Sequence, residues 1–497
     1  GAARAGGTEV GAVGVQAVGR AGAFAARATD PTAMAHNVAG IAGLSGVQWT
    51  LSANLGRWSH CFARSGRYDG VESGVETRTT VFADSDYARA RPAYPEVCNE
   101  AETAVVPQAL VTWRVAPGVA LGAGLLTPAG VGAQRFPDRV MTPAGLAPSP
   151  GRYMVLRTGV VIVHPTLALA VSPTPWLRLG VALQPSYGRF HGETTANAIG
   201  SQSPATDVRN AVDATAFFWA GNLGVMVQPS PNVTVGFHAH LNAQPVVFRG
   251  TSTATVRPYA ADPAERHRST FETEVSLPLP SVFRLGVRYA ALRRDAPQDS
   301  AARDPLRHER YDVELDLHYE NASVLQQVVT RNRGTVEVSP GMGSPATPLV
   351  ALPRSWRDVW GLRLAAEAVA VRDVFALRAG LSWDRGAQTG PRTLNGREVP
   401  FNPYAGIDTA AYDTVTLAAG ASLRWGAITL DVAYQHFMLS PNVVEEGRAT
   451  TVSGSAPITF GDCARGPGYP GPGACSNNEG SYRAEYGIFA VGITGRH

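Results

Sequence analysis

The sequence predicts an all-β protein, a transmembrane antiparallel β-barrel of about fourteen strands with an N-terminal hatch, or plug, in its lumen. Three observations lead to this prediction. Apolar and polar residues alternate along many segments, the connections between these segments are short and long in turn, and the N-terminal region is rich in glycine and alanine. We therefore divide the chain into a plug at residues 1–45 and a barrel with long extracellular loops at residues 46–497.

Alternation is clearest in the four segments VTVGFHAHLN, VFRLGVRYA, YDVELDLHYE and FALRAGLSWD, which begin at Val233, Val282, Tyr311 and Phe375. Successive side chains of a β-strand point to opposite faces, so each segment has one apolar and one polar face. The segments run for about ten residues or more, the length of a membrane-spanning strand. Tyr, Trp and Phe lie near the ends of the apolar faces, as in the aromatic girdles of membrane barrels. A β-sandwich would alternate in the same way, so the class depends on the connections.

The connections between the alternating segments separate these two classes. Short turns are expected near residues 116–118, 173–175, 229–231, 372–373 and 426, with a somewhat longer one near 293–307. Long polar connections are expected near residues 59–102, 128–152, 191–213, 251–268, 329–353, 386–409 and 440–480. Bacterial outer-membrane barrels have short turns on one side and long loops on the other, and an even number of strands. No run of about 18 apolar residues exists, so the chain is expected to span the bilayer by closing a sheet.

The segment AVGRAGAFAARATDPTAMAHNVAGIAG, which begins at Ala17, is interpreted as the plug. Gly19 and Gly22 permit positive φ angles and close backbone approach, and Phe24 supplies apolar bulk to bury. Asp30 is the expected N-cap of a short helix with Pro31 at its first position. The alternative is a disordered tail of glycine and alanine.

The four cysteines are expected to form two loop disulfides, Cys61 with Cys98 and Cys463 with Cys475, in an oxidising compartment. Free thiols are the alternative. Neither pair has the short spacing of a zinc site, and no other metal site is expected. The formal net charge of +3 is too small to indicate a nucleic-acid partner.

The sequence contains no recognisable catalytic centre. No Ser or Cys lies in a nucleophile motif, so we expect neither an enzyme nor a cofactor. Lumen-facing charges occur on two consecutive strands, Arg284 and Arg288 on one and Asp312, Glu314 and Asp316 on the next. Cross-strand pairing makes a structural network their expected role.

Residues 10–42, VGAVGVQAVGRAGAFAARATDPTAMAHNVAGIA, resemble the N-terminal hatch of the long-chain fatty acid transporter (FadL-type) family of outer-membrane proteins. LLTPAGVGAQRF, which begins at Leu125, is similar to the family's kinked third strand, and SYRAEYGIFAVGIT resembles its closing strand. Two features differ from the family pattern. Asn37-Val38-Ala39 replaces Asn-Pro-Ala, and the chain ends in His497 where such barrels usually end in Phe.

The resemblance implies a passive channel for small hydrophobic molecules, either long-chain fatty acids or aromatic hydrocarbons. It implies a ligand pocket against the hatch and lateral exit at a wall kink of Pro128, Ala129 and Gly130, which would face Asn37 and Ala39. The expected hatch and gating residues are Gly19, Gly22, Phe24, Asp30, Asn37, Val38 and Ala39. The protein would be a monomer in the bacterial outer membrane, in contact with lipid and lipopolysaccharide.

Two other functions remain open from the sequence. One is a structural or interaction barrel whose disulfide-pinned loops contact another surface. The other is a porin for polar solutes, which a plugged lumen argues against.

Overall fold

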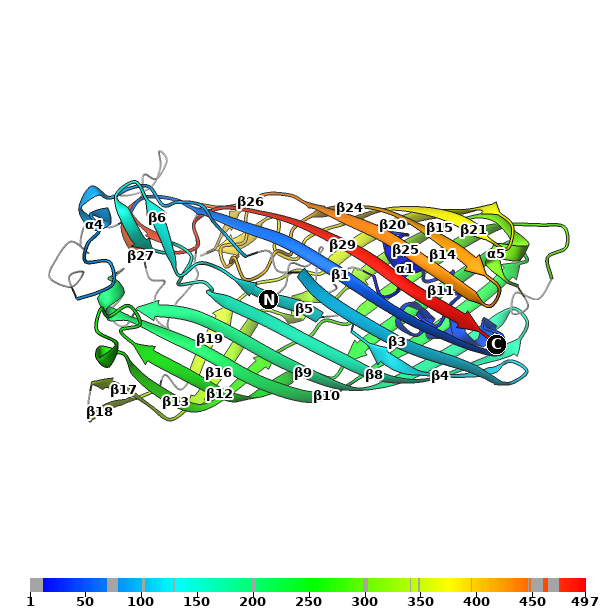
Figure 1. The fold of residues 1–497 in the computed structure, drawn as a ribbon, viewed down its shortest axis with the longest axis horizontal. Coiled ribbons are helices and arrows are strands. Elements are labelled where there is room, and N and C mark those ends of the chain that lie inside the picture. Colours follow the sequence, from blue (N-terminus) through cyan, green and yellow to red (C-terminus); the bar gives the residue numbers. More distant parts are fainter. Residues whose placement is uncertain are drawn as a thin grey trace.

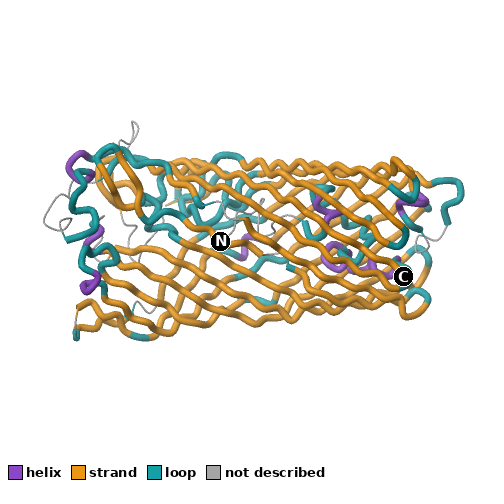
Figure 2. Tube along the Cα trace, in the orientation of Figure 1, coloured by secondary structure: helices purple, strands orange, loops and turns teal. Residues whose placement is uncertain are grey.

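The fold is described from a computed structural model, in which most of the chain forms one closed antiparallel barrel (Figures 1 and 2). The structure describes residues 12–68, 79–100, 103–127, 130–197, 203–297, 303–339, 341–346, 349–394, 396–445, 447, 459–463 and 473–497. None of the described helices is long and apolar enough to cross a membrane.

The wall contains fourteen strand positions, as the alternating connections predict. Closure comes from pairing of the first strand with the last, from Gln48 opposite Arg496 to Arg64 opposite Gly480. In wall order the strands are β1 (Val47–Arg64), β3 (Thr103–Ala116), β4 (Val119–Leu126) continued by β5 (Gly130–Arg135), β8 (Arg157–Thr174), β9 (Leu177–Asn197), β10 (Asp207–Ser230), β11 (Val233–Asn242) continued by β12 (Val246–Val256), β13 (His267–Leu277) continued by β14 (Val282–Leu292), β15 (Glu309–Glu320) continued by β16 (Gln327–Arg333), β19 (Leu349–Pro353) continued by β20 (Val359–Val371), β21 (Phe375–Asp384), β24 (Thr414–Trp425), β25 (Ile428–Leu439) continued by β26 (Asn442–Val444), and β29 (Gly480–Arg496).

Smaller elements occupy the two ends of the barrel and its lumen. The end at the left of Figure 1 carries α4 (Tyr87–Ala90), β2 (Val97–Cys98) and the hairpins β6–β7 (Arg139–Thr142, Gly145–Pro148), β17–β18 (Thr335–Ser339, Met342–Pro345) and β27–β28 (Thr459–Cys463, Gly473–Ser476). A further hairpin, β22–β23, spans Arg392–Leu394 and Arg397–Val399, and η3, η4 and η6 are single turns at Pro204–Thr206, Pro263–Glu265 and Ala322–Val324. The opposite end carries the short turns and α5 (Pro305–His308), and it corresponds to the periplasmic side of such barrels.

Several wall strands are longer than the sequence predicts. The expected connection at 191–213 is mostly strand, because β9 runs to Asn197 and β10 begins at Asp207, and β12 extends into the expected connection at 251–268 as far as Val256. The outward face of this region is polar, with exposed Arg189 and Asp213, so apolar alternation disappears while the ladder continues. The wall therefore extends beyond the apolar belt on the loop side.

The apolar faces of the strands point outward, toward lipid. Large apolar side chains stay exposed around the barrel; Leu315, for example, is 51% exposed and Leu377 is also 51% exposed. An exposed apolar belt of this extent is expected only for a surface that another apolar phase covers. Tyr319 and Trp360 pack against each other at the loop-side boundary of the belt, with their rings tilted and the centroids 4.4 Å apart, which is the place of an aromatic girdle.

Residues 12–44 lie inside the barrel, toward the periplasmic end (Figure 1). They form α1 (Val15–Val18), α2 (Ala33–His36) and the 3₁₀ helix η1 (Val38–Gly43). Met34, Val38 and Ile41 are fully buried and pack against wall residues of β4, β8 and β9. This segment thus fills the lumen with small residues and a few larger apolar ones.

The prediction that Asp30 caps the plug helix is wrong by two residues. The helix begins at Ala33 with Thr32 as its N-cap, and no side chain caps it. The Asp30 carboxylate instead accepts a hydrogen bond from the Thr32 backbone N–H, 2.8 Å away, and closes the turn before the helix. The signature used for the prediction, Asp followed by Pro, is shared by a turn that precedes a helix and by the start of a helix itself.

The Cys61–Cys98 disulfide is confirmed, and it joins β1 to the short strand β2. The side chains of Cys463 and Cys475 lie outside the described part of the structure, although their strands β27 and β28 pair. Among the described residues, Cys61, Glu96 and Cys98 are the one group with metal-ligand spacing, and its two sulfurs are bonded to each other.

Removal of the disulfide by the double change Cys61→Ser and Cys98→Ser is expected to loosen the first outer loop without opening the barrel. The bond joins residues 37 positions apart, and a cross-link of that span removes roughly 3–4 kcal/mol of unfolded-chain entropy. Trypsin should then cut faster at the exposed Arg89 in α4, while the barrel keeps its mobility on a semi-native gel. Equal cleavage rates in the two proteins would show that packing alone holds the loop.

Candidate functional site

Two arginines anchor the plug to the wall. Arg20 places Nη2 at 2.8 Å from Asp312 Oδ1 and 3.0 Å from Glu314 Oε2, and all three side chains are at most 1% exposed. Arg27 pairs with Asp312 and places Nη2 2.6 Å from Glu367 Oε1. Both arginines belong to the plug, whereas the carboxylates come from β15 and β20. Breaking one partner of a buried ion pair typically costs about 3–5 kcal/mol.

The plug backbone binds Glu314 and the neighbouring Asp316 of β15. Asp316 Oδ2 accepts hydrogen bonds from the N–H groups of Phe24 and Ala25 at 3.0 and 3.1 Å. Glu314 Oε1 accepts from the N–H groups of Ala26 and Arg27 at 2.7 and 3.2 Å. Residues 20–27, which we call the anchor segment, are therefore fixed along one strand of the wall.

Further ion pairs extend this arrangement into a charged layer across the periplasmic half of the lumen. Arg378 places Nε 2.9 Å from Glu367 Oε2 and Nη1 3.2 Å from Asp431 Oδ1. Arg288 pairs with Asp312 and Glu309. The lumen-facing charges thus form a structural network that includes the plug. The charged layer consists of Arg20, Arg27, Arg288, Arg378, Glu309, Asp312, Glu314, Asp316, Glu367 and Asp431.

Glycines in the wall let the plug backbone touch the strands. A Cβ on Gly236 of β11 would lie 2.1 Å from Ala25 O, and one on Gly224 of β10 would lie 2.4 Å from Asn37 Oδ1. Both distances exclude a side chain at these positions. The tight fit of the plug therefore depends on wall positions that have no side chain.

The expectation that Asn37 and Ala39 face the third-strand kink is wrong. Asn37 Nδ2 donates to Ala25 O at 2.8 Å and to Val225 O of β10 at 3.1 Å, and its Oδ1 accepts from the Ala39 N–H at 3.2 Å. Strand β10 lies three wall positions from β4. Because Gly224 on β10 has no side chain, the plug backbone lies close to this strand, and the Asn37 amide donates to the Val225 carbonyl.

The other predicted gating residues are all buried in the plug. A Cβ on Gly19 would lie 3.0 Å from the Arg378 side chain, and Gly22 has φ +85° beside Arg363. Phe24 is fully buried, with its ring edge-on to His36 at a centroid distance of 5.5 Å. Of the three kink residues, Pro128 and Ala129 lie outside the described part of the chain, and Gly130 begins β5.

The hydrogen-bond ladder of the wall is interrupted beside the predicted kink. β3 pairs with β1 along its length, from Val47 opposite Trp113 to Arg57 opposite Thr103. With β4, however, it pairs only as far as Ala109 opposite Leu125. β5 pairs with β8. Within the described ranges, residues 103–108 therefore have no ladder partner on the side of β5, and Pro107 lies in this edge, where proline is tolerated.

We call this interruption of the ladder between β3 and β5 the wall gap, and a hollow lies on each side of it. The inner cavity, of about 20 Å³, is lined by Ala12 and Val13 of the plug and by Asn54, Gly56, Trp58, Ala104, Val106, Gln108, Thr127, Tyr486 and Ile488 of the wall. The outer hollow, of about 430 Å³, is lined by Leu51, Ser52, Ala53, Pro107, Gln108, Ala109, Leu125, Val491, Gly492 and Ile493. Gln108 lines both, so the two hollows adjoin at the gap. The outer hollow has an almost entirely apolar lining on the lipid-facing side.

Above the plug, the loop-side half of the lumen is lined by aromatic side chains. Phe62 stacks on Tyr482 with centroids 4.7 Å apart, and Tyr486 contacts both Phe437 at 4.8 Å and Trp58 at 5.9 Å. These buried rings belong to one apolar cluster that also includes Val15, Val18 and Phe24 of the plug. An apolar lining thus leads to the plug from the loop side, and the charged layer begins at the plug.

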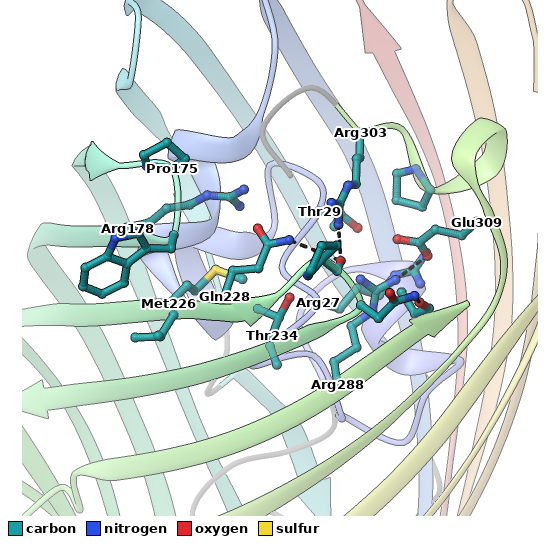
Figure 3. A pocket seen from close by; sticks show the side chains of 17 residues that line it. Arg27, Thr29, Pro175, Arg178, Met226, Gln228, Thr234, Arg288, Arg303 and Glu309 are labelled. Carbon is teal, nitrogen blue, oxygen red and sulfur yellow. Dashed lines mark hydrogen bonds and ion pairs between the residues drawn. The ribbon is translucent and has the colours of Figure 1, made fainter. Parts of the chain in front are cut away.

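Residues 303–308, which we call the strap, cross the periplasmic mouth from the β14–β15 turn. Asp304 accepts two hydrogen bonds from Arg424 of β24, at 2.6 and 2.9 Å, and one from Arg496 of β29, at 2.9 Å. A cavity of about 50 Å³ separates the strap from the plug and the wall, with Arg27, Thr29 and Arg303 among its lining residues (Figure 3). The sequence predicts only a longer turn here.

Burial by itself would raise the pKa of the Asp304 carboxyl, but the charges of Arg496 and Arg424 outweigh it and hold this pKa below its ordinary value. The strap contact therefore contributes stability above the ordinary aspartate pKa of about 3.9, and this stability is lost as the pH falls through the lowered value.

A family model described as outer membrane protein transport protein (OMPP1/FadL/TodX) matches residues 1–461. The chain belongs to this family. Three solved structures are similar: a Pseudomonas aeruginosa FadL homologue (14% identity, TM-score 0.68, covering 98% of this chain and 99% of that chain), the P. putida toluene transporter TodX (12%, 0.63, 99% and 99%) and the Ralstonia pickettii toluene transporter TbuX (13%, 0.59, 98% and 98%). At these identities the likeness shows the fold. No curated protein matches.

Membership in the OMPP1/FadL/TodX family confirms three predictions. The protein is an outer-membrane β-barrel of a bacterium, its family transports hydrophobic compounds, and its members are not enzymes. The residues that sequence reasoning missed are Arg20, Arg27, Asp304 and the polar residues of the inner cavity. For the two arginines a signal existed, because a lone charge within a buried apolar segment requires a partner.

Neutralising the anchor by Asp312→Asn is expected to loosen the plug. The change removes the carboxylate shared by Arg20, Arg27 and Arg288, at a cost of about 3–5 kcal/mol. Amide exchange at Phe24 to Arg27 should accelerate by at least tenfold, and single channels in planar bilayers should begin to flicker. Glu485→Gln, at a carboxylate that is 71% exposed, is the control and should change neither. Unchanged exchange in Asp312→Asn would show that packing alone holds the plug.

Releasing the strap by Asp304→Asn is expected to expose the periplasmic side of the plug at neutral pH. A cysteine at Thr29 should react with a polar maleimide on the order of tenfold faster in this background, since two arginine contacts lose a charged acceptor. When Asp304 is intact, the maleimide rate of the cysteine at position 29 is divided by the rate of the unfolded protein at the same pH. This ratio should stay constant from pH 7 to about 5 and rise only below about pH 4. A rise of this ratio near pH 6 would show that a group other than the Asp304 carboxyl controls the strap contact.

Proposed function

We propose that this protein takes up small hydrophobic molecules passively, with long-chain fatty acids and aromatic hydrocarbons as the candidate substrates, and releases them sideways through the gap between β3 and β5. The observation that carries the proposal is the interrupted ladder, with a cavity on its lumen side and an apolar hollow on its lipid side. TodX of P. putida and TbuX of R. pickettii, whose structures are similar, are toluene transporters, which supports a hydrophobic cargo.

The distribution of polarity in the lumen favours the lateral route. Apolar surface gains about 25 cal/mol per Å² on leaving water, so the aromatic half of the lumen attracts an apolar solute. Beyond the plug, the same solute would have to displace the buried ion pairs of the charged layer and pass the strap. Exit through the gap transfers the solute to lipid without breaking an ion pair.

Plug motion is proposed to be local. The anchor segment and Asn37 hold the plug on β15 and β10, so Phe24, Asp30, Asn37, Val38 and Ala39 act as fixed points. Gly19 borders the anchor segment and serves as the hinge for the preceding residues, whereas Gly22 lies within the anchor segment. Ala12 and Val13, which line the inner cavity, would then move away from the gap. The porin alternative has less support because the described part of the lumen is occupied by the plug and the charged layer.

Filling the gap is the direct test. Val106→Trp puts a bulky side chain into the inner cavity and is expected to reduce uptake of radiolabelled toluene and oleate by cells at least tenfold. Val212→Trp is the matched control, because Val212 lies half-buried on β10, which pairs on both sides at that residue. The control should transport normally. Normal uptake by a folded Val106→Trp protein would rule out the lateral route.

A further inference from the structure

Three polar atoms in the inner cavity have no hydrogen-bond partner among the described residues: Asn54 Oδ1, Trp58 Nε1 and one amide atom of Gln108, its Nε2. The three side chains are 7%, 2% and 3% exposed. Buried polar groups are nearly always hydrogen-bonded, and those that are not require an explanation. Three such atoms around one cavity indicate a polar group that binds there.

The orientation of two of these groups is fixed. Asn54 Nδ2 donates to Ala12 O of the plug at 3.0 Å, so its Oδ1 is left as an acceptor. The indole nitrogen of Trp58 can only donate. The Gln108 amide contacts Ser52 Oγ at 3.1 Å, and because a hydroxyl can donate or accept, Gln108 can turn either amide atom to the cavity. The cavity thus offers one fixed donor, one fixed acceptor and one adjustable group.

The charge and size of the cavity restrict what binds. None of the residues that line it is Arg, Lys, His, Asp or Glu, so an ionised carboxylate would be buried there without a counter-charge. Its volume of about 20 Å³ has room for a group the size of one water molecule. A hydroxyl group meets both limits, and it needs both a donor and an acceptor.

We propose that Asn54, Trp58 and Gln108 form a recognition site for the hydroxyl group of a neutral, otherwise apolar solute, such as a phenol or an alcohol. The Trp58 N–H donates to the hydroxyl oxygen, Asn54 Oδ1 accepts the hydroxyl proton, and Gln108 supplies the third contact. The cavity admits the hydroxyl group alone, so the apolar part of the solute lies in the adjoining outer hollow, which shares Gln108 with the cavity. The site satisfies the hydroxyl after it leaves water and before it enters lipid. This assignment rests on the proposed lateral route, because the site borders the gap.

Trp58→Phe is the principal test, since it removes the N–H and keeps an aromatic ring against Tyr486. The probes are 4-methylphenol and toluene, which differ by one hydroxyl, and 4-methylbenzoate, which adds a charge. Calorimetric titration uses the purified full chain in lipid nanodiscs, corrected for partition into empty discs. The unsubstituted protein should bind 4-methylphenol about tenfold more tightly than toluene and should not bind 4-methylbenzoate. Trp58→Phe should weaken 4-methylphenol about five- to tenfold and leave toluene unchanged, the effect expected from one hydrogen bond.

Two controls separate recognition from folding. Trp49→Phe makes the same change on the outer face of β1 and should alter neither affinity. Asn54→Leu should weaken 4-methylphenol to a similar degree, and its barrel should keep the same thermal unfolding. Equal affinities of the unsubstituted protein for both probes, or equal losses for both in Trp58→Phe, would overturn the proposal and assign the three polar atoms to a bound water.

Uptake by cells distinguishes this site from the route itself. If Val106→Trp blocks both probes while Trp58→Phe slows only 4-methylphenol, the route and the site both stand. If Val106→Trp blocks both probes and Trp58→Phe slows neither probe nor weakens its binding, the hydroxyl site falls and the lateral route stands. If Val106→Trp transports normally but Trp58→Phe weakens 4-methylphenol binding, the route falls and the site stands.

Discussion

The buried ion network between the plug and β15 is the interaction on which the rest of the structure depends. Arg20 and Arg27 carry two positive charges into a lumen that excludes water, and Asp312, Glu314 and Glu367 compensate them. Glu314 also accepts hydrogen bonds from the plug backbone, so charge pairing and backbone satisfaction reinforce each other. Because these contacts hold residues 20–27 on one strand, the plug divides the lumen into an aromatic half and a charged half. That division makes a straight passage for an apolar solute unfavourable.

The wall gap is the second constraint on the proposed route, because the plug and the charged layer make a straight passage unfavourable. A barrel in lipid must satisfy its backbone through the ladder, and an unpaired edge is costly in the hydrocarbon region. Within the described ranges of the chain, residues 103–108 depart from that rule, between an inner cavity and an apolar hollow. Pro107 lacks the N–H that such an edge would leave unpaired. A local departure from a strict physical rule commonly marks a functional position, and here it coincides with the part of the plug that lies outside the anchor.

Several features of the molecule were predictable because they arise from short-range patterns. The alternation in YDVELDLHYE identifies its strand, since side chains of a strand point to opposite faces. The short turns at residues such as Pro117 and Gly118 set the number of strands. The strand ends at Asn197 and Asp207 were missed because the outward face there is polar, whereas the ladder that continues the strands depends on neighbouring chains of the sheet.

The sequence by itself determined the barrel, its orientation of faces, the plug segment and the Cys61–Cys98 pair, since periodicity, turn residues and the family resemblance are all local in the chain. Only the tertiary structure decided where the plug binds. Asn37 contacts β10 rather than the kink because Gly224 on that strand leaves room for its amide, and no pattern near Asn37 encodes a glycine 187 residues later (224 − 37). Likewise Asn54, Trp58 and Gln108 look like ordinary inward residues until strand register brings them to one cavity. Function here depends on contacts between distant segments, and barrel closure creates them.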